Sequence, residues 1–513
     1  MQNTKSNGIH HVTLIARDAQ ANVDFYVGFL GLRLVKQSGG FEDAEQLHLF
    51  YGDRTGSPGS LVSFLIWQDG SSGRIGNGQV IEIAFAVPPE SLGEWMTRAI
   101  RSGVKFEGPS REFGESVLRL KDPDGIIVKL VASGMQAASP WRDDPAAIQR
   151  LRAVTILTET PEETASFVKR FGYREAAREE SAVRLVSETD AIDIRDGSGF
   201  VPGAPGTGIA DHVAFRATDV AAVKQAEADL SKLNSSPTNF HDRKYFTSLY
   251  VREPGGTLLE LATDGPGFAI DEPVETLGER LFVPDSDRAR EQDLRVMLPQ
   301  FSRPGEPRIT KRELPFVHRI HTPDNPDGRT FVLLHGTGGN EADLMPLANR
   351  IAPRAMLLGV RGRASEEGIS RWFRRFTTTS FDQADIRAEA LAFAAFFEGA
   401  ISAYGIEPAR TTFLGFSNGA NFIGALLALH SQVISRAILL RPMQVLDELP
   451  KADLSGKHIL SLTGANDPYA FGAPPLEKWL QESGATLDAR TIRAGHELTQ
   501  EDLTLTQAWV AAQ

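Results

Sequence analysis

An internal repeat in the first half of the chain constrains the fold more than any other feature of the sequence. Residues 81–87 (IEIAFAV) resemble residues 211–217 (DHVAFRA), and residues 122–130 (DPDGIIVKL) resemble residues 253–261 (EPGGTLLEL). In each copy a strand is followed by an amphipathic helix, over residues 91–102 or 220–233, and then by strands around a Pro-x-Gly turn. One such unit cannot bury its apolar face alone, so the copies must pack together.

Two weaker copies complete the pattern. Residues 10–14 (HHVTL) begin one copy, with a helix expected over residues 19–30. Residues 152–156 (RAVTI) begin the other, with a helix expected over residues 161–171. Residues 8–264 are therefore predicted to form four β-α-β-β-β modules, paired two by two, which is an α+β architecture.

Two breaks in the pattern divide the chain. The first is a predicted linker over residues 133–145, where Gly134, Pro140 and Pro145 interrupt a region rich in strands. The second covers residues 299–315 and follows an amphipathic, helical stretch at 285–298. At roughly 150 residues per domain, a chain of 513 residues allows about three domains. We expect these domains at residues 1–135, 150–300 and 313–513.

The composition excludes several classes of function. The chain has no cysteine, so any bound metal must use His, Asp or Glu. Its 66 acidic and 54 basic residues give a net charge of -12, the wrong sign for binding nucleic acid. No apolar stretch reaches the roughly 18 residues that a membrane helix needs, and residues 1–8 lack the apolar core of a secretory signal. We expect a cytoplasmic protein with no nucleic-acid or membrane partner, and a homo-oligomer is compatible with the sequence.

Aligning the modules with one another indicates where a metal can bind. The equivalent position on the first strand of modules one to four holds His11, Glu82, Ala153 and His212. The equivalent position on the last strand of modules two and four holds Lys129 and Glu260. A protonated lysine cannot ligate and alanine has no ligand atom. The complete set of candidate ligands is therefore His11, His212 and Glu260.

The residue types of this set favour iron. Glu260 stands among Leu258, Leu259 and Leu261, and a carboxylate is costly to bury there unless it is paired or binds a metal. Two histidines and one carboxylate leave open positions for substrate and oxygen, as in the non-haem Fe(II) oxygenases. We predict Fe(II) as cofactor and O2 as co-substrate, while Mn(II) can occupy the same ligands.

Residues 8 to about 300 resemble the vicinal oxygen chelate superfamily, and within it the dioxygenases that cleave hydroquinone rings. The resemblance depends on residues 245–256 (YFTSLYVREPGG), residues 260–268 (ELATDGPGF) and the following Asp271 and Glu272. It implies a small aromatic diol as substrate and a pocket lined by His10, Arg243 and Tyr250. Because side chains alternate along a strand, His10 is expected behind His11 unless the strand is distorted. His48 and His241 are interpreted as solvated or structural.

The last third of the chain has the pattern of an α/β-hydrolase. The strand at residues 411–414 runs into residues 415–419 (GFSNG) and a helix at 420–430, so Ser417 stands at a nucleophile elbow. Asp467 and His496 follow in the Ser, Asp, His order of that fold. The amides of Thr337 and Asn418 are expected to form the oxyanion hole. Residues 313–513 resemble the carboxylesterase/phospholipase branch, which implies an ester, thioester or lactone substrate.

These features predict a bifunctional enzyme of aromatic catabolism that joins a ring-cleaving Fe(II) dioxygenase to a serine hydrolase. One alternative keeps the metal but makes the first half a glyoxalase-like isomerase or lyase. Another makes the first half a non-catalytic module that binds small aromatics for the esterase. The presence of Arg243 and Tyr250 disfavours the isomerase or lyase, and the complete set of metal ligands disfavours the non-catalytic module.

Overall fold

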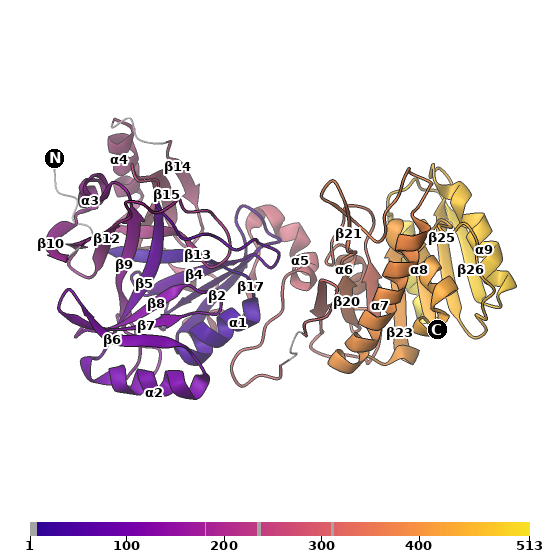
Figure 1. Cartoon of the computed structure of the whole chain (residues 1–513), viewed down its shortest axis with the longest axis horizontal. Helices are drawn as coiled ribbons and strands as arrows, with labels where there is room; N and C mark the ends of the chain where they lie inside the picture. Colours follow the sequence, from indigo (N-terminus) through magenta and orange to yellow (C-terminus); the bar gives the residue numbers. More distant parts are fainter. Residues whose placement is uncertain (1–7, 180, 233–236, 309–311, 513) are drawn as a thin grey trace. The chain divides into compact units, whose positions relative to one another are not determined.

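The computed structural model describes residues 8–179, 181–232, 237–308 and 312–512. The chain forms two compact units, the first running to residue 288 with 301–307 added, and the second containing 289–300 and the rest of the chain from 308. Figure 1 labels the elements of both units. Residues 1–7, on which the expectation about a secretory signal depends, lie outside the described residues, as does the predicted end of a helix at residue 233.

The first unit is built from two curled sheets with short helices outside them (Figure 1). The larger sheet has the following strands in spatial order: β14 (Asn239–Asp242), β15 (Thr247–Arg252), β16 (Leu258–Thr263), β13 (Ile209–Ala217), β1 (Ile9–Ala16), β4 (Leu61–Ile66), β3 (Leu47–Gly52), β2 (Arg33–Gly39) and β17 (Leu281–Phe282). The smaller sheet has these: β10 (Arg174–Glu179), β11 (Ala182–Val186), β12 (Ala191–Asp196), β9 (Arg150–Thr158), β5 (Gln79–Val87), β8 (Ile127–Ala132), β7 (Glu115–Lys121) and β6 (Phe106–Glu112).

The order of the strands shows which modules share a sheet. Module one (β1–β4) joins module four (β13–β16) through the antiparallel pair β1 and β13. Module two (β5–β8) joins module three (β9–β12) through β5 and β9. The division expected between residues 135 and 150 therefore does not separate the two sheets, because each sheet takes strands from both sides of it. Module one therefore pairs with module four, and module two pairs with module three.

The helices of the first unit follow the repeat. One lies after the first strand of each module: α1 (Ala19–Val23) continued by a π-helical turn at Asp24–Phe29, α2 (Leu92–Ser102) preceded by a 3-10 turn at Pro89–Ser91, α3 (Pro161–Val168) continued by a 3-10 turn at Lys169–Phe171, and α4 (Val220–Ser231). Helix α2 ends at Gly103, whose φ of 66° is the left-handed conformation that glycine adopts without strain. Short 3-10 turns at Phe268–Ile270 and Val274–Thr276 follow the last module.

The second unit is a seven-stranded sheet in which all but the first edge strand are parallel. In spatial order its strands are β18 (His318–His321), β20 (Met356–Val360), β19 (Thr330–Leu334), β23 (Thr411–Phe416), β24 (Arg436–Leu440), β25 (His458–Gly464) and β26 (Thr486–Ile492). A small hairpin of β21 (Ala364–Glu366) and β22 (Ile369–Arg371) lies outside this sheet. Every residue of β19 is buried, as expected for a strand covered on both faces.

Helices cover both faces of this sheet. One apolar core contains residues of α7 (Gln383–Tyr404), α8 (Asn418–Leu429) and α9 (Ala473–Glu482). The other contains residues of α5 (Glu291–Met297), α6 (Met345–Ile351) and α10 (Gln500–Ala511). Short 3-10 turns lie at Asp285–Arg290, Pro408–Arg410, Ser431–Val433 and Ala470–Gly472. The fold is thus α+β in the first unit and α/β in the second, which confirms the predicted fold class.

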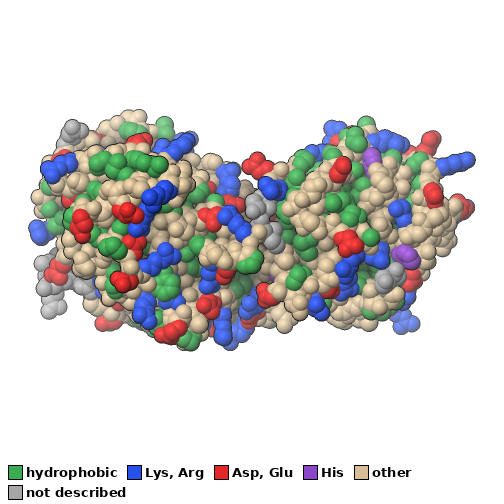
Figure 2. All heavy atoms as spheres, turned by 90° about the horizontal axis from the view of Figure 1, so that it is seen from below, with side chains coloured by type: hydrophobic (Ala, Val, Ile, Leu, Met, Phe, Trp, Pro, Cys, Tyr) green, Lys and Arg blue, Asp and Glu red, His purple; other side chains and the backbone are tan. Residues whose placement is uncertain are grey.

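On the face that Figure 2 shows, basic and acidic side chains are interspersed. Of the helices in the described part of the chain, none combines the length and apolar character needed to cross a bilayer.

Candidate active sites

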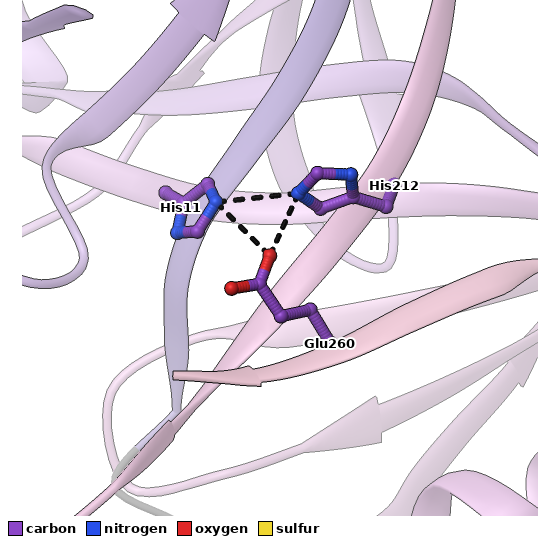
Figure 3. Close-up of side chains that lie close together, drawn as sticks. All are labelled: His11, His212 and Glu260. Atoms are coloured by element: carbon purple, nitrogen blue, oxygen red, sulfur yellow. Dashed lines mark hydrogen bonds and ion pairs between the residues drawn. The ribbon is translucent and has the colours of Figure 1, made fainter. Parts of the chain in front are cut away.

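Three side chains from three strands of the larger sheet converge in the first unit (Figure 3). They are His11 on β1, His212 on β13 and Glu260 on β16, and all three are buried. Nε2 of His11 lies 3.3 Å from Nε2 of His212, and both face Oε2 of Glu260, at 3.3 Å and 2.8 Å respectively. The pairing of module one with module four creates this cluster, because β1 and β16 flank β13.

The cluster fits a divalent metal ion. Oε2 of Glu260 is fully buried and accepts no well-directed hydrogen bond from the described residues, although it lies close to both imidazoles. Its other oxygen, Oε1, accepts a hydrogen bond from Ser248. Ligands that lie about 2.1 Å from one ion, at right angles to each other, are about 3.0 Å apart. The three separations of 2.8–3.3 Å therefore suit one octahedral face around a single ion.

The charges around the cluster also favour a cation. Burial by itself lowers the pKa of His212, but the charge of Glu260 and a hydrogen bond to Asp211 raise it to about 9. Burial opposes ionisation of Glu260, yet the two imidazoles hold its pKa well below the ordinary value. Oδ2 of Asp211 lies 2.7 Å from Nδ1 of His212, so it orients the ring with Nε2 toward the cluster. The alignment of modules gave Asp211 no role.

His10 lies beside His11 rather than among the three converging atoms. The register of β1 against β13 shifts between Ile9 and His11, so a bulge distorts the strand here. Nδ1 of His10 lies 2.9 Å from Nδ1 of His11, on the opposite side of that ring from Nε2. Burial and the neighbouring His11 lower the pKa of His10 to about 3. A neutral His10 can therefore accept the Nδ1 proton of His11 and fix its tautomer.

A cavity of about 560 Å³ opens beside the cluster, and two of the three predicted pocket residues, Arg243 and Tyr250, line it. The third, His10, is not among the residues that line this cavity, because its ring lies against His11. The ring of Tyr250 lies edge-on to His212, with centroids 5.3 Å apart. Burial and the charge of Glu260 raise the pKa of Tyr250 well above its ordinary value, so its hydroxyl stays protonated. Arg243 lies over the ring of Tyr250 and donates a hydrogen bond of 2.8 Å to Glu42.

Both histidines that were interpreted as solvated or structural also line this cavity. His241 lies 3.8 Å from Glu42 and edge-on to Tyr250. The ring of His48 packs against that of Phe50, with centroids 4.0 Å apart and the ring planes tilted by 35°. The sequence did not place them because the cavity arises from the curl of the sheet, which brings β3 and β14 around the cluster.

The smaller sheet has a buried ion pair at the positions equivalent to the His11, His212 and Glu260 cluster. Its register makes Lys129 the equivalent of Glu260, since Lys129 pairs with Ala84 as Glu260 pairs with Ala214. Nζ of Lys129 lies 2.8 Å from Oε2 of Glu82 and donates to Glu112 at 3.0 Å. Burial opposes the charge of Glu82, but Lys129 lowers the pKa of Glu82 to about 2. An ammonium group, held by the chain itself, supplies the cation in this sheet.

In the second unit, Ser417, His496 and Asp467 form a hydrogen-bonded line. Nε2 of His496 lies 2.8 Å from Oγ of Ser417, and Nδ1 of His496 lies 2.8 Å from Oδ2 of Asp467. The side chain of Asp467 is 2% exposed and that of His496 is 34% exposed. These distances place an imidazole that can act as a base within reach of the serine hydroxyl, and a carboxylate on the other side of the imidazole.

Strain and close packing expose the serine. Ser417 lies between β23 and α8 with φ 51° and ψ -114°, a conformation that few non-glycine residues adopt. A methyl group at Gly419 would lie 2.0 Å from the carbonyl oxygen of Leu334, so only glycine allows α8 to approach β19 this closely. The turn therefore requires glycine where the motif has it.

The predicted oxyanion-hole residues are held together by one segment, residues 370–372. The carbonyl of Ser370 accepts from the amide of Gly338 at 2.9 Å, and Arg371 donates to Oγ1 of Thr337 at 3.0 Å. The amide of Trp372 donates to the side chain of Asn418 at 2.9 Å. Asn418 begins α8, where backbone N–H groups have no helical partner. The segment thus links both predicted donors, a link that the sequence motif does not reveal.

Arg441 fixes the loop that carries His496. Its side chain and that of Asp502 are both 0% exposed and form a bidentate ion pair at 2.7 and 2.9 Å. Arg441 also donates to the carbonyls of Gly495, at 3.0 Å, and Glu497, at 2.8 Å, on either side of the histidine. No sequence signal marked Arg441 beyond its position directly after β24.

Comparison with known proteins gives relatives of both units. Residues 8–130 match the family described as the Glyoxalase/Bleomycin resistance protein/Dioxygenase superfamily. MhqO of Bacillus subtilis, which carries the name of a ring-cleaving dioxygenase, is 35% identical over 288 residues, covering 55% of this chain and 92% of MhqO. A chlorohydroquinone/hydroquinone 1,2-dioxygenase of Sphingobium indicum is 30% identical over 310 residues, covering 56% of this chain and 95% of that protein.

Solved structures and a further relative extend these matches. A crystal structure of a Bacillus subtilis protein named as a dioxygenase is 34% identical, with a TM-score of 0.56, and covers 58% of this chain and 98% of that one. MhqD of Bacillus subtilis, which carries the name of a hydrolase, is 34% identical over 195 residues, covering 38% of this chain and 96% of MhqD. A carboxylesterase from Mesorhizobium loti is 42% identical, with a TM-score of 0.38, and covers 39% of this chain and 97% of that one.

Proposed function

The chain belongs to the ring-cleaving dioxygenase family of the glyoxalase superfamily through its first unit and to the family of the hydrolase MhqD through its second, and from this premise we propose that it is a bifunctional enzyme. The first unit cleaves the ring of a hydroquinone-like diol with O2 at Fe(II) held by His11, His212 and Glu260. The second unit hydrolyses an ester-type bond with Ser417 as nucleophile. Both substrates are small molecules.

The residues of the first unit divide the work of ring cleavage. His11, His212 and Glu260 would hold Fe(II), which would supply the redox chemistry that lets O2 react with the diol ring. Asp211 holds His212 in the tautomer that ligates, and His10 does the same for His11. Tyr250, protonated at working pH, can deliver a proton to the substrate beside His212. Arg243 keeps its charge and stabilises the anion that ring opening produces.

The observation that carries this half of the proposal is the convergence of three ligand atoms, two of whose residues, His11 and His212, line a cavity of about 560 Å³. The experiment is oxygen uptake with a panel of dihydroxybenzenes after anaerobic loading of the full chain with Fe(II). A ring-cleaving dioxygenase adds both oxygen atoms, so the expected product is heavier than the diol by one O2. A glyoxalase-like lyase would consume no oxygen, and a binding module would bind the diol without changing it.

In the second unit, His496 takes the proton of Ser417 as the hydroxyl attacks the carbonyl carbon. Asp467 holds Nδ1–H of His496 and stabilises the imidazolium that forms. The amides of Thr337 and Asn418 donate to the oxygen that becomes negatively charged. The same imidazolium then protonates the leaving alcohol, and water, activated by His496, releases the acid from the serine ester.

The observation that carries this half is the line of two 2.8 Å contacts that joins serine, histidine and aspartate. A serine-directed phosphonate is expected to add to Ser417 and to abolish turnover of short p-nitrophenyl esters. Labelling of another residue, with Ser417 unmodified, would refute the assignment. Oxygen uptake in the labelled protein serves as the internal control.

A further inference from the structure

His48 lies on the inner face of the sheet that carries the metal cluster. On β3 it pairs with Leu65 of β4, and Leu65 pairs with Ile15 of β1. Ile15 follows His11 by four residues on the same strand, so the side chains of His48 and His11 project from the same face. Both line the 560 Å³ cavity. His48 therefore lines the same cavity as His11, although its strand, β3, lies two strands away from β1 in the sheet.

The imidazole of His48 lacks a polar partner within the described part of the chain. Its Nε2 is buried without a hydrogen bond, and its contact is the ring of Phe50. The other imidazoles in the cavity differ, since His11 and His212 face Glu260, and His241 faces Glu42. Burial lowers the pKa of His48 to about 3, so the ring is neutral and offers one donor and one acceptor. An unpaired buried polar group of this kind is costly, and a ligand hydroxyl can satisfy it.

A hydroquinone needs a second hydrogen-bonding group in the cavity, and His48 can supply it. A hydroquinone carries two hydroxyls at opposite ends of a rigid ring, so a molecule with one oxygen at the metal cluster must place the other elsewhere in the cavity. Tyr250 lies against His212, and Arg243 lies over the ring of Tyr250 and is held by Glu42. Phe41, Phe50 and Phe246 supply apolar wall for the ring.

We propose that His48 binds the second hydroxyl of a para-dihydroxybenzene whose first hydroxyl is held at the His11, His212 and Glu260 cluster. His48 is then a residue that determines specificity, because it distinguishes para-diols from simple phenols. The assignment rests on the proposed dioxygenase function of this cavity. It gives a role to a half-buried imidazole whose Nε2 is buried and has no hydrogen bond from the described residues.

The test compares hydroquinone with phenol, which lacks the second hydroxyl, and compares the wild type with a variant that lacks the imidazole of His48. Binding of hydroquinone and of phenol is measured by calorimetry on the Fe(II)-loaded full chain without oxygen, for the wild type and for His48→Phe, which keeps an aromatic ring against Phe50. The wild type is expected to bind hydroquinone roughly tenfold more tightly than phenol, the effect of pairing one buried polar group. In His48→Phe this preference disappears, because hydroquinone binding weakens while phenol binding stays the same.

Two further variants complete the design. His48→Gln keeps a hydrogen-bonding group and is expected to retain most of the preference for hydroquinone. If His48→Phe does not fold, His48→Gln still allows the binding measurement at this position. His241→Phe removes a second imidazole from the same cavity and is expected to change the two affinities by the same factor. A wild type without the preference, a preference that survives His48→Phe, or an equal weakening of both ligands would overturn the assignment.

The two proposals fail in different ways. If the wild type binds hydroquinone with the preference that depends on His48 but consumes no oxygen, the dioxygenase function is wrong and the role of His48 in binding stands. If oxygen is consumed but the preference does not depend on His48, the assignment of His48 alone is wrong.

Discussion

From the buried ion pair between Arg441 and Asp502 we predict two separate effects of mutation, one on the stability of the second unit and one on its ester hydrolysis. Arg441→Met removes the cation and leaves the carboxylate of Asp502 buried, although the amide and hydroxyl of Thr499 still donate to it. Breaking a buried pair on one side costs about 3–5 kcal/mol. For a unit of roughly 200 residues, that loss lowers the unfolding midpoint by roughly 6–20 °C.

The same change is expected to free the loop that carries His496, the proposed general base. Without Arg441 the carbonyls of Gly495 and Glu497 lose their hydrogen bonds, and His496 lies between them. A shift of about 1 Å at a catalytic group can lower the rate about a hundredfold. We therefore expect kcat for p-nitrophenyl esters to fall by about this factor, with a smaller change in KM.

A double variant distinguishes the two effects. Arg441→Met with Asp502→Leu leaves no charge buried alone, so the unfolding midpoint is expected to recover most of its loss. The two carbonyls remain without a donor, so kcat is expected to remain low. The assays are scanning calorimetry of the full chain and ester hydrolysis at a temperature where every variant is folded. A single variant with a wild-type midpoint, or a double variant with wild-type kcat, would refute this reasoning.

Three other predictions follow from the two units. An acylated hydroquinone tests the order of the reactions: if hydrolysis comes first and frees the phenol, Ser417→Ala should consume little oxygen with the ester, whereas equal consumption by mutant and wild type contradicts that order. Lys129→Met leaves Glu82 charged and buried, and should destabilise the first unit by about 3–5 kcal/mol without reducing its metal content, as calorimetry and metal analysis can show. Burial raises the pKa of Asp122 to about 7, above about 3.9 for the unfolded chain. The folded state therefore holds an extra proton between these values, so its stability is full below about pH 4 and falls toward pH 7. In thermal unfolding measured from pH 4 to 8, Asp122→Asn should reduce this loss of stability with rising pH. If the variant loses as much stability as the wild type, another group causes the pH dependence.

Much of the fold could be predicted because local patterns repeat. The strand and helix periods of the modules are visible in the sequence, and equivalent positions identified His11, His212 and Glu260 as a group. The pairing of modules could not be predicted in the same way. Each module presents a similar first strand, so the pattern alone does not decide whether β1 meets β13 or β5.

The residues that sequence reasoning missed act through long-range contacts. Arg441 follows an apolar strand as surface arginines do, and its partners at residues 495, 497 and 502 come more than fifty residues later. The two imidazoles of the cavity wall, His48 and His241, reach it only through the curl of the sheet. Strand alternation placed His10 away from the cluster, and the bulge at this point sets it against the ring of His11 instead.

The central claim is that His11, His212 and Glu260 hold the metal at which O2 cleaves the ring. The most direct measurement compares wild type with Glu260→Ala after anaerobic loading with Fe(II), recording bound iron, oxygen uptake with hydroquinone and hydrolysis of p-nitrophenyl acetate in the same samples. We predict one iron per chain in the wild type, and loss of iron and oxygen uptake in the variant with ester hydrolysis nearly unchanged. Stoichiometric iron and full oxygen uptake in Glu260→Ala would contradict the claim.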